Sequence, residues 1–475
     1  MSDQRPGTVH RPEQAGTATA PSRPVRAGLL VAVLAVGTTA FGLIPSLTYP
    51  ALPHLRRAFD TDQSTITWVV TAYLASAAVA TPVLGRLGDL VGRGRLLLGC
   101  LVLLSLGSLL AALAPSVEVL IAARVVQGAG GGLLPLSYAI VREHLPPARS
   151  PAVVGLLSSL IAISAGVGIV IAGPVIDAFG YRVLFWIPLA ATGLAAAVAV
   201  VVMPRGARSP GESLPMLSAA LFGTGMVAGL VALSQGAEWG WTSARVLLLA
   251  LTGVAALVAQ WLVDRGRGSR AFMDPGLLRL RSVALGHAVG FLAGFGMYAS
   301  FAFVAPLLQA PVSTGFGFGV DTSAAGLMML PGAVCSFVGG IVAPRWSRRS
   351  GTRTVLAVAS LVAAAGMAGI ALASGERVVF LASYGAVGLG TGATLVCLTN
   401  HLLAAVPPAQ LAAVTGMNAN LRTVGGAVGT AVLAAVVTDD RAYPLAFGLL
   451  AVVLVAGAIF ASRLPALPKT LGSPT

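Results

Sequence analysis

Fourteen long apolar runs dominate the sequence and constrain its fold more than any other feature. A helix that crosses the roughly 30 Å hydrocarbon core of a bilayer needs about 20 mostly apolar residues. A transmembrane β-barrel would instead show short segments of alternating polar and apolar residues, and this sequence shows none. The predicted spans are 28–48, 65–84, 96–114, 119–140, 151–176, 183–203, 214–234, 246–263, 283–307, 323–343, 354–374, 378–403, 410–437 and 443–462. The sequence therefore predicts an all-α, polytopic membrane protein.

The composition excludes several other classes of protein. Charged residues make up 10% of the 475 residues, against about 25% in a typical soluble domain. Cys100, Cys335 and Cys397 lie in apolar runs, which argues against a disulfide framework. Neither a metal-ligand spacing nor a phosphate-binding loop is found, so we expect no metal and no cofactor. We interpret the net charge of +14 as a basic membrane face and expect no nucleic-acid partner.

The basic residues orient the chain in its bilayer. With the N-terminus inside, 22 of the 30 Lys and Arg residues fall in inner segments and six in outer segments. Basic residues favour the cytoplasmic side. We therefore expect a multi-pass protein of the plasma membrane with both termini in the cytoplasm. A membrane enzyme or sensor is a remote alternative, because no catalytic constellation is found.

Two parts of the chain repeat one glycine pattern. Three glycines of the fourth span recur 260 positions later in the twelfth: 128, 130 and 132 against 388, 390 and 392. Membrane proteins with internal repeats are typically carriers, with a substrate site between the halves near the bilayer midplane. The predicted organisation is a disordered cytoplasmic arm at 1–27, a six-helix half at 28–205, an inserted helix pair at 206–270, a second six-helix half at 271–463 and a tail at 464–475.

A glycine- and arginine-rich string separates the second and third spans, Gly85-Arg-Leu-Gly-Asp89-Leu-Val-Gly92-Arg93-Gly-Arg95. It predicts a tight turn at which glycines allow close helix approach. Asp89 can cap a helix or pair with an arginine there. We expect Gly85, Asp89, Gly92 and Arg93 to form a conformational gate. The alternative is an ordinary basic cytoplasmic loop.

This string resembles the loop signature of the major facilitator superfamily, and the fourth-span string from Arg124 through Gln127 to Gly132 resembles its second signature. Span five carries Gly173-Pro174 and resembles the antiporter signature of exporters, although Asp177-Ala178 stands where that signature has a glycine pair.

Two further strings resemble the fourteen-span drug:proton antiporter family: Glu238-Trp239-Gly240-Trp241 and the stretch from Gly416 to Gly426. The resemblance implies a transporter, not an enzyme, that exports amphiphilic small molecules (drugs, antibiotics or the cell's own metabolites). It also implies alternating access and protons as the coupling ion.

We expect the transporter to act as a monomer. A dedicated exporter of one metabolite, such as an amino acid or organic anion, is the alternative. Ile44 stands where that family usually carries an aspartate, which leaves the coupling open.

Charged residues within the spans cost roughly 2.5–3.5 kcal/mol each on insertion scales, so each is a candidate for a structural or functional role. From a rise of about 1.5 Å per residue, Arg124 lies roughly 9 Å from the outer face and Arg422 roughly 18 Å from the inner face. Asp177 falls at the outer rim. Because no carboxylate reaches the midplane, the predicted cavity is positive. Its expected cargo is neutral, zwitterionic or anionic.

These considerations assign a role to each candidate. The coupling or protonation candidates are Arg124, Asp177 and His287. The expected cavity residues are Gln127, Tyr73, Asn418, Asn420, Arg422, Met297, Tyr298 and Met328. Gly173 and Pro174 join the gate, because proline removes a backbone hydrogen bond and lets a helix bend.

Each role has a structural alternative. Arg124 and Gln127 can clamp two helices, and the polar residues of span thirteen can form a helix-joining network. Asp177 can pair with Arg182, and His287 can be a satisfied buried imidazole. The methionines and tyrosines can simply pack in a core or face lipid.

Overall fold

A computed structural model describes residues 27–203, 214–268, 271–272, 275–372, 375–407, 410–437 and 442–465. These residues hold fourteen helices that are long and apolar enough to cross a membrane, and the predicted all-α architecture is confirmed. Most of the predicted arm and tail, residues 1–26 and 466–475, lies outside the described residues.

The helices follow one another through short connections. In chain order they are α1 (Ala27–Ala58), α2 (Gln63–Val91), α3 (Arg93–Ala112), α4 (Val117–Gly128), the 3₁₀ turn η1 (Ala129–Gly132), α5 (Leu133–His144), α6 (Ser150–Phe179), α7 (Val183–Val202), α8 (Met216–Trp239), α9 (Ala244–Asp264), α10 (Pro275–Arg279), α11 (Arg281–Gln309), the 3₁₀ turn η3 (Val312–Thr314), α12 (Thr322–Ser350), α13 (Thr352–Leu372), α14 (Arg377–Ala405), α15 (Leu411–Val436) and α16 (Tyr443–Ser462). The fourth span is therefore built from α4, η1 and α5.

The structure refines two local predictions. The tight turn expected within the string from Gly85 to Arg95 is confirmed but is a single residue long, because α2 remains helical through Val91 and only Gly92 separates it from α3. Gly92 has a φ of 102°, a backbone conformation open to glycine but strained for other residues, so one residue is enough to reverse the chain. The first span is also longer than predicted, since α1 continues to Ala58.

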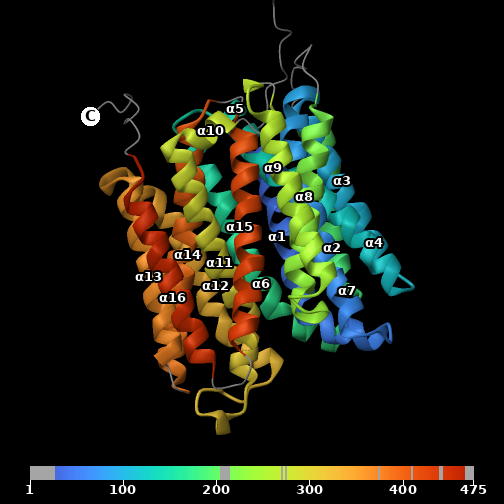
Figure 1. Cartoon of the computed structure of the whole chain (residues 1–475), viewed down its shortest axis with the longest axis vertical. Coiled ribbons are helices and arrows are strands. Elements are labelled where there is room, and N and C mark those ends of the chain that lie inside the picture. The colour runs from blue at the N-terminus through green and yellow to red at the C-terminus, as the bar shows by residue number, and fades with distance from the viewer. Residues whose placement is uncertain are drawn as a thin grey trace, which may run out of the picture.

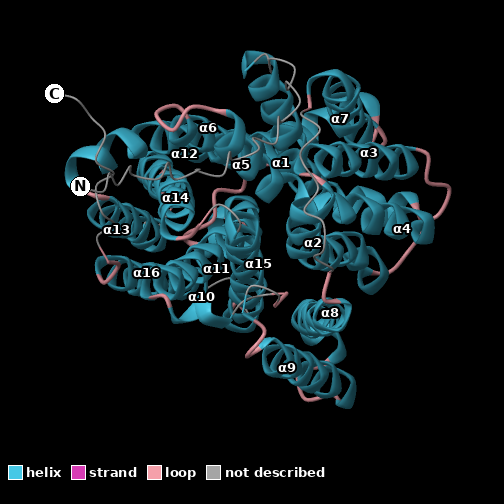
Figure 2. Ribbon diagram, turned by 90° about the horizontal axis from the view of Figure 1, so that it is seen from above, coloured by secondary structure: helices cyan, strands magenta, loops and turns pink. Residues whose placement is uncertain are grey.

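The helices form two groups, α1–α7 and α11–α16, that lie side by side (Figure 2). Within the first group α1 packs on α6 and α7, α3 packs on α4 and α7, and α2 packs on α4. The second group repeats these pairings, with α11 on α15 and α16, α13 on α14 and α16, and α12 on α14. This repeated pairing supports the predicted duplication, whose boundaries stay a prediction.

The inserted pair packs at one side of the junction between the groups. Helix α8 contacts α2 of the first group and α15 of the second, and α9 packs chiefly against the outer side of α8 (Figure 2). At the end of α9 the buried Asp264 carboxylate accepts hydrogen bonds from the Ser218 hydroxyl at 2.7 Å, the Gln260 amide at 2.6 Å and the Phe272 backbone N–H at 3.3 Å. Because α8, α9 and the chain leading to α10 all contribute donors, Asp264 fixes the insertion to the segment that follows it.

The two ends of the bundle differ in their packing. We call the end at which α1, α3, α6, α11 and α13 begin the proximal end (top in Figure 1) and the opposite end the distal end. Toward the proximal end, buried side chains of both groups form one hydrophobic core. Toward the distal end each group has its own core. The groups therefore share a core proximally, whereas distally they meet mainly through α6, whose Ile169 packs on the core of the second group.

One helix pair joins the groups along nearly its whole length. Helix α6 packs on α12, and the contact is closest where Gly166 meets Ala333 and where Gly340 meets Ser159. A β-carbon on either glycine would clash with its neighbour, so these small residues permit the close approach. Small residues serve helix packing in membranes in the same way.

Candidate functional site

Arg124 forms the most extensive polar contact of the first group. Its side chain is fully buried in α4, and its Nε donates to the Val69 carbonyl of α2 at 2.9 Å. Its Nη1 donates to Gln127 Oε1 at 2.7 Å, and Gln127 Nε2 donates to Ser108 Oγ of α3 at 2.9 Å. The guanidinium carbon also lies 4.6 Å from the centre of the Tyr73 ring, a cation–π contact. This geometry matches a clamp that joins α2, α3 and α4.

Glycine makes the clamp possible. Gly128, one turn after Arg124, lies against the Tyr73 carbonyl of α2, and a β-carbon there would come within 2.5 Å of that oxygen. The resulting close approach of α4 to α2 brings the arginine within reach of a backbone carbonyl. The glycine-rich fourth span therefore supports the position of its own charged residue.

Three tyrosines extend from Arg124 toward the second group. Tyr73 of α2 lies beneath the Arg124 guanidinium, and Tyr49 of α1 and Tyr298 of α11 lie in its neighbourhood. Tyr73 is 3% exposed, whereas Tyr49 is 41% exposed. Tyr298 packs over Gly426 of α15. The phenols therefore form a layer that links both groups near the clamp.

Helix α15 carries a second set of polar side chains. Asn418 is buried, and its Nδ2 lies 3.4 Å from both the Gly286 carbonyl and His287 Nδ1 of α11. Asn420 Nδ2 donates to the Ala78 carbonyl of α2 at 2.6 Å. That bond directly joins the two groups. His287 is 4% exposed, and its Nε2 has no hydrogen-bond partner among the described residues.

Arg422 combines a position in the middle of a span with the absence of a polar partner among the described residues. It lies near the middle of α15, 11 residues from Leu411 and 14 from Val436. It makes no hydrogen bond or ion pair with any described residue, and its Nε is buried. Helix α15 packs against α5 of the first group, on which the Tyr138 hydroxyl lies 2.8 Å from Ser158 Oγ.

Carboxylates in the spans are confined to helix ends. Glu118, Glu143, Asp177, Glu238 and Asp264 each lie within three residues of a helix terminus. The backbone places Asp89 two residues before the end of α2; its side chain is outside the described part. No group of three or more His, Cys, Asp or Glu side chains that could hold a metal ion forms among the described residues. The middle of the bundle therefore carries arginine charge without a matching acid.

Asp177 lies exposed, two residues before the end of α6, as its depth predicts. It makes no ion pair with Arg182 in the described structure; Arg182 instead lies 5.5 Å from the Tyr181 ring centre. The proposed Asp177–Arg182 pairing is therefore wrong. Gly173 is buried and Pro174 exposed, and α6 stays helical through both.

Some of the methionines expected to line the substrate cavity lie in a hydrophobic core instead. Met329 and Met328 pack in the distal core of the second group, which also contains Phe318 and Phe380. Met297 is half-buried on α11. Packing accounts for the first two side chains, and a role in substrate binding stays a prediction for Met297.

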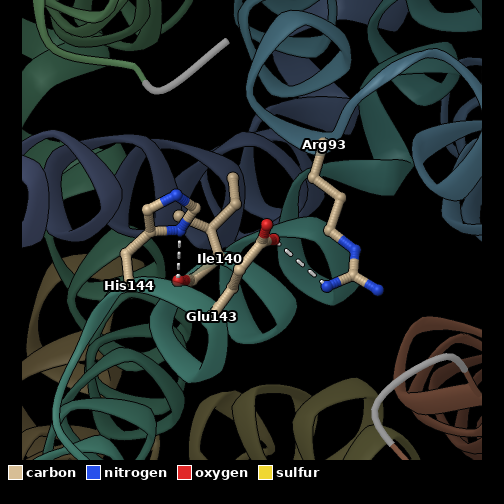
Figure 3. A network of polar contacts seen from close by, with 4 residues as sticks. All are labelled: Arg93, Ile140, Glu143 and His144. Carbon is tan, nitrogen blue, oxygen red and sulfur yellow. Dashed lines mark hydrogen bonds and ion pairs between the residues drawn. The ribbon is translucent and has the colours of Figure 1, made fainter. Parts of the chain in front are cut away.

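Arg93, one of the residues expected to form a gate, has a partner that could not be predicted from the sequence. Arg93 at the start of α3 pairs with Glu143 near the end of α5, with Nη1 3.3 Å from Oε2 (Figure 3). The neighbouring His144 Nδ1 lies 3.2 Å from the Ile140 carbonyl. Both partners of the ion pair belong to the first group, so this contact tightens α3 against α5.

Sequence reasoning missed Ser108, Tyr138, Glu143 and the Asp264 cluster. Ser108 and Tyr138 give no sequence signal, because a hydroxyl in an apolar span is common. Asp264 could have been found, since Gln260 and Asp264 stand four residues apart at the end of a span and share a helix face.

A bundle of fourteen span-length helices with polar side chains between two helix groups is the architecture of a polytopic membrane carrier. The sequence matches the Major Facilitator Superfamily over residues 34–430 and 290–474, and the chain belongs to that family.

Named relatives and a solved structure agree with this assignment. The chain is 30% identical to the methylenomycin A resistance protein of Streptomyces coelicolor, over 97% of this chain and 98% of that protein. It is 26% identical to a multidrug resistance protein B homolog of Mycobacterium tuberculosis, over 80% of this chain and 70% of that protein. Its fold is similar to that of the human organic anion transporter MFSD10 (TETRAN), with a TM-score of 0.66 and 15% identity, over 92% of this chain and 99% of that chain.

Proposed function

We propose that this protein is a secondary active transporter that exports amphiphilic small molecules by alternating access. The observation that carries the proposal is the packing of the two helix groups, which share one core proximally and have separate cores distally. Alternating access requires one state in which the groups are closed at the proximal end and another in which they are closed at the distal end, with the substrate site between them. The resistance proteins among its relatives support export of small molecules.

We propose that the proximal end faces the cytoplasm. Most arginines lie in the segments of this end, as the positive-inside rule requires. The structure then represents the state closed to the cytoplasm. The Asn420–Ala78 hydrogen bond and the α6–α12 contact hold the groups together in this state.

Proton antiport is the coupling that the family resemblance favours. No described carboxylate lies midway through a span, so the candidates are Asp177 at the distal rim and His287 beside Asn418. Arg124 contributes by fixing the clamp next to the tyrosine layer. Asp177 is exposed, which suits a group that exchanges protons with the outer medium.

The direct test uses everted membrane vesicles with a preformed pH gradient and a dye that reports it. Neutral, anionic and cationic amphiphiles are added in turn to vesicles with and without the protein. A compound that collapses the gradient only when the protein is present establishes proton antiport. If labelled compounds move without any proton flux, coupling to protons is refuted and facilitated diffusion remains. If no compound moves, export itself is refuted.

The assignment of Asp177 has its own test. Asp177→Asn is expected to abolish uphill export and spare downhill exchange, because only the uphill direction requires proton release. Glu238→Gln, which changes an exposed acid near the distal end of α8, is the matched control. Uphill export that persists in Asp177→Asn would remove this residue from the coupling scheme.

A further inference from the structure

Arg422 carries a positive charge that the described protein does not balance. It lies roughly 17 Å from the proximal end of α15 and 21 Å from the distal end, from a rise of about 1.5 Å per residue. It forms no ion pair and no hydrogen bond with the described residues. The carboxylates of the spans all lie near helix ends, a distance too great for direct contact.

An arginine at this depth cannot place its guanidinium in the water at either membrane interface. Long basic side chains near helix ends extend to the membrane interface, but the middle of a helix is out of reach of either interface. Arginine also stays protonated in proteins. The charge is therefore retained, and the four N–H donors of the two terminal nitrogens are available to a partner, whereas Nε is buried.

A hydroxyl pair of the other helix group lies on the helices beside α15. Helix α15, which carries Arg422, packs against α5, and the hydroxyl of Tyr138 on α5 contacts Ser158 of α6. Arg422 is part-exposed, unlike the fully buried Arg124, and Tyr138 is 7% exposed. A ligand between the groups can therefore reach the guanidinium directly and the phenol of Tyr138 only at its edge.

We propose that Arg422 is the recognition residue for an oxyanion, a carboxylate or sulfonate carried on an apolar molecule, with Tyr138 as a second contact. The inference rests on the proposed function and narrows its substrate class. A guanidinium matches the planar, two-oxygen geometry of a carboxylate and binds it through paired charge-assisted hydrogen bonds. Such an anion supplies the counter-charge that the protein lacks.

The test measures binding to the purified full-length protein in lipid nanodiscs by isothermal titration calorimetry. The probes are 2-naphthalenesulfonate and its neutral isostere 2-naphthalenesulfonamide, which share one apolar ring system. A cationic probe, (2-naphthylmethyl)trimethylammonium, completes the series. From the strength of hydrogen bonds to charged groups, the wild-type protein is expected to prefer the sulfonate to the sulfonamide by roughly 10- to 100-fold.

Single-residue variants test whether Arg422 causes the preference for the sulfonate over the sulfonamide. Arg422→Gln is expected to remove the sulfonate preference, and Arg422→Lys to retain part of it. Tyr138→Phe is expected to weaken sulfonate and sulfonamide alike by roughly threefold, since a single neutral hydrogen bond is lost. Arg377→Gln, an exposed position at the start of α14, is the control and should bind as the wild type does.

Several outcomes overturn the inference. They are a wild-type protein without a sulfonate preference, tightest binding of the cationic probe, and a preference that survives Arg422→Gln. The wild-type comparison alone decides the matter if Arg422→Gln does not fold. Vesicle export without anion preference leaves the proposed function standing and removes only this inference. Sulfonate binding through Arg422 without any vesicle export removes the proposed function instead.

Discussion

Two arginines lie inside the bundle, and the structure treats them in opposite ways. Arg124 is fully buried, donates to Val69 and Gln127, and lies over the Tyr73 ring. Arg422 is part-exposed and has no partner among the described residues. Both are expensive to place in a bilayer. Arg124 is therefore held by protein groups through Nε and Nη1, with only its Nη2 left without a hydrogen-bond partner among the described residues, whereas Arg422 is available to a ligand.

The surroundings of the two residues explain this difference. Arg124 belongs to a glycine-rich span that lies close to α2, so a backbone carbonyl comes within its reach. Arg422 lies on α15, which packs against α5 of the other group, and under the proposed alternating access these helices separate. A charge paired across that junction would hold the groups together, so an unpaired arginine suits a moving interface.

The largest expected effect tests this comparison directly. Arg124→Met should lower the free energy of unfolding by about 2–3 kcal/mol, because it removes charge-assisted hydrogen bonds and leaves Gln127 unsatisfied. Arg422→Met should cause no loss, because no hydrogen bond or ion pair with a described residue is removed. Thermal unfolding in detergent, followed by fluorescence-detected size exclusion, measures both. Equal destabilisation by the two variants would contradict the distinction.

The inserted helix pair contains a second buried charge with protein partners, the Asp264 carboxylate. Asp264→Ala should lower the free energy of unfolding by about 2 kcal/mol, because Ser218, Gln260 and the Phe272 N–H lose a charged acceptor. Glu238→Ala, at the exposed distal end of the same pair, is the matched control and should change stability little. The same melting assay measures both. If the two variants melt alike, Asp264 does not anchor the insertion.

A smaller effect is expected one contact further from Arg124. Ser108→Ala removes the acceptor for Gln127 Nε2 and should cost about 1 kcal/mol. Ser234→Ala, at an exposed serine whose hydroxyl bonds within its own helix, is the control. A double-mutant cycle of Ser108→Ala with Arg124→Met measures their coupling. Simple additivity would show that Ser108 does not support the clamp.

The smallest effect is expected at the proximal surface. Glu143→Gln breaks the Arg93–Glu143 ion pair, whose carboxylate side chain is 43% exposed. Water and salt screen such pairs, so the expected cost is below about 0.5 kcal/mol and should vanish at high salt. Melting curves at low and high salt measure it. A large, salt-independent loss would make this pair a structural element comparable to the Arg124 clamp.

The number of membrane-spanning helices could be predicted from the sequence, but their exact lengths could not, since α1 continues to Ala58; the direction of the chain across the bilayer stays a prediction. Twenty mostly apolar residues have few alternatives to a membrane-crossing helix, and arginine placement gives a direction. It also placed Arg422 near mid-helix and Asp177 at a rim, because helical rise converts sequence position into depth. These properties depend on one segment at a time.

Helix packing determines which polar groups find partners. The direct partners of Arg124 come from α2 and α4, with Ser108 of α3 reached through Gln127, and those of Asp264 come from two helices and the chain that follows. Glu143 stands 50 residues from Arg93, and Asn420 stands 342 residues from Ala78. Sequence periodicity shows the face on which a side chain lies but not the helix that it meets. Helix packing therefore decided that Arg124 is clamped while Arg422 faces the junction unpaired.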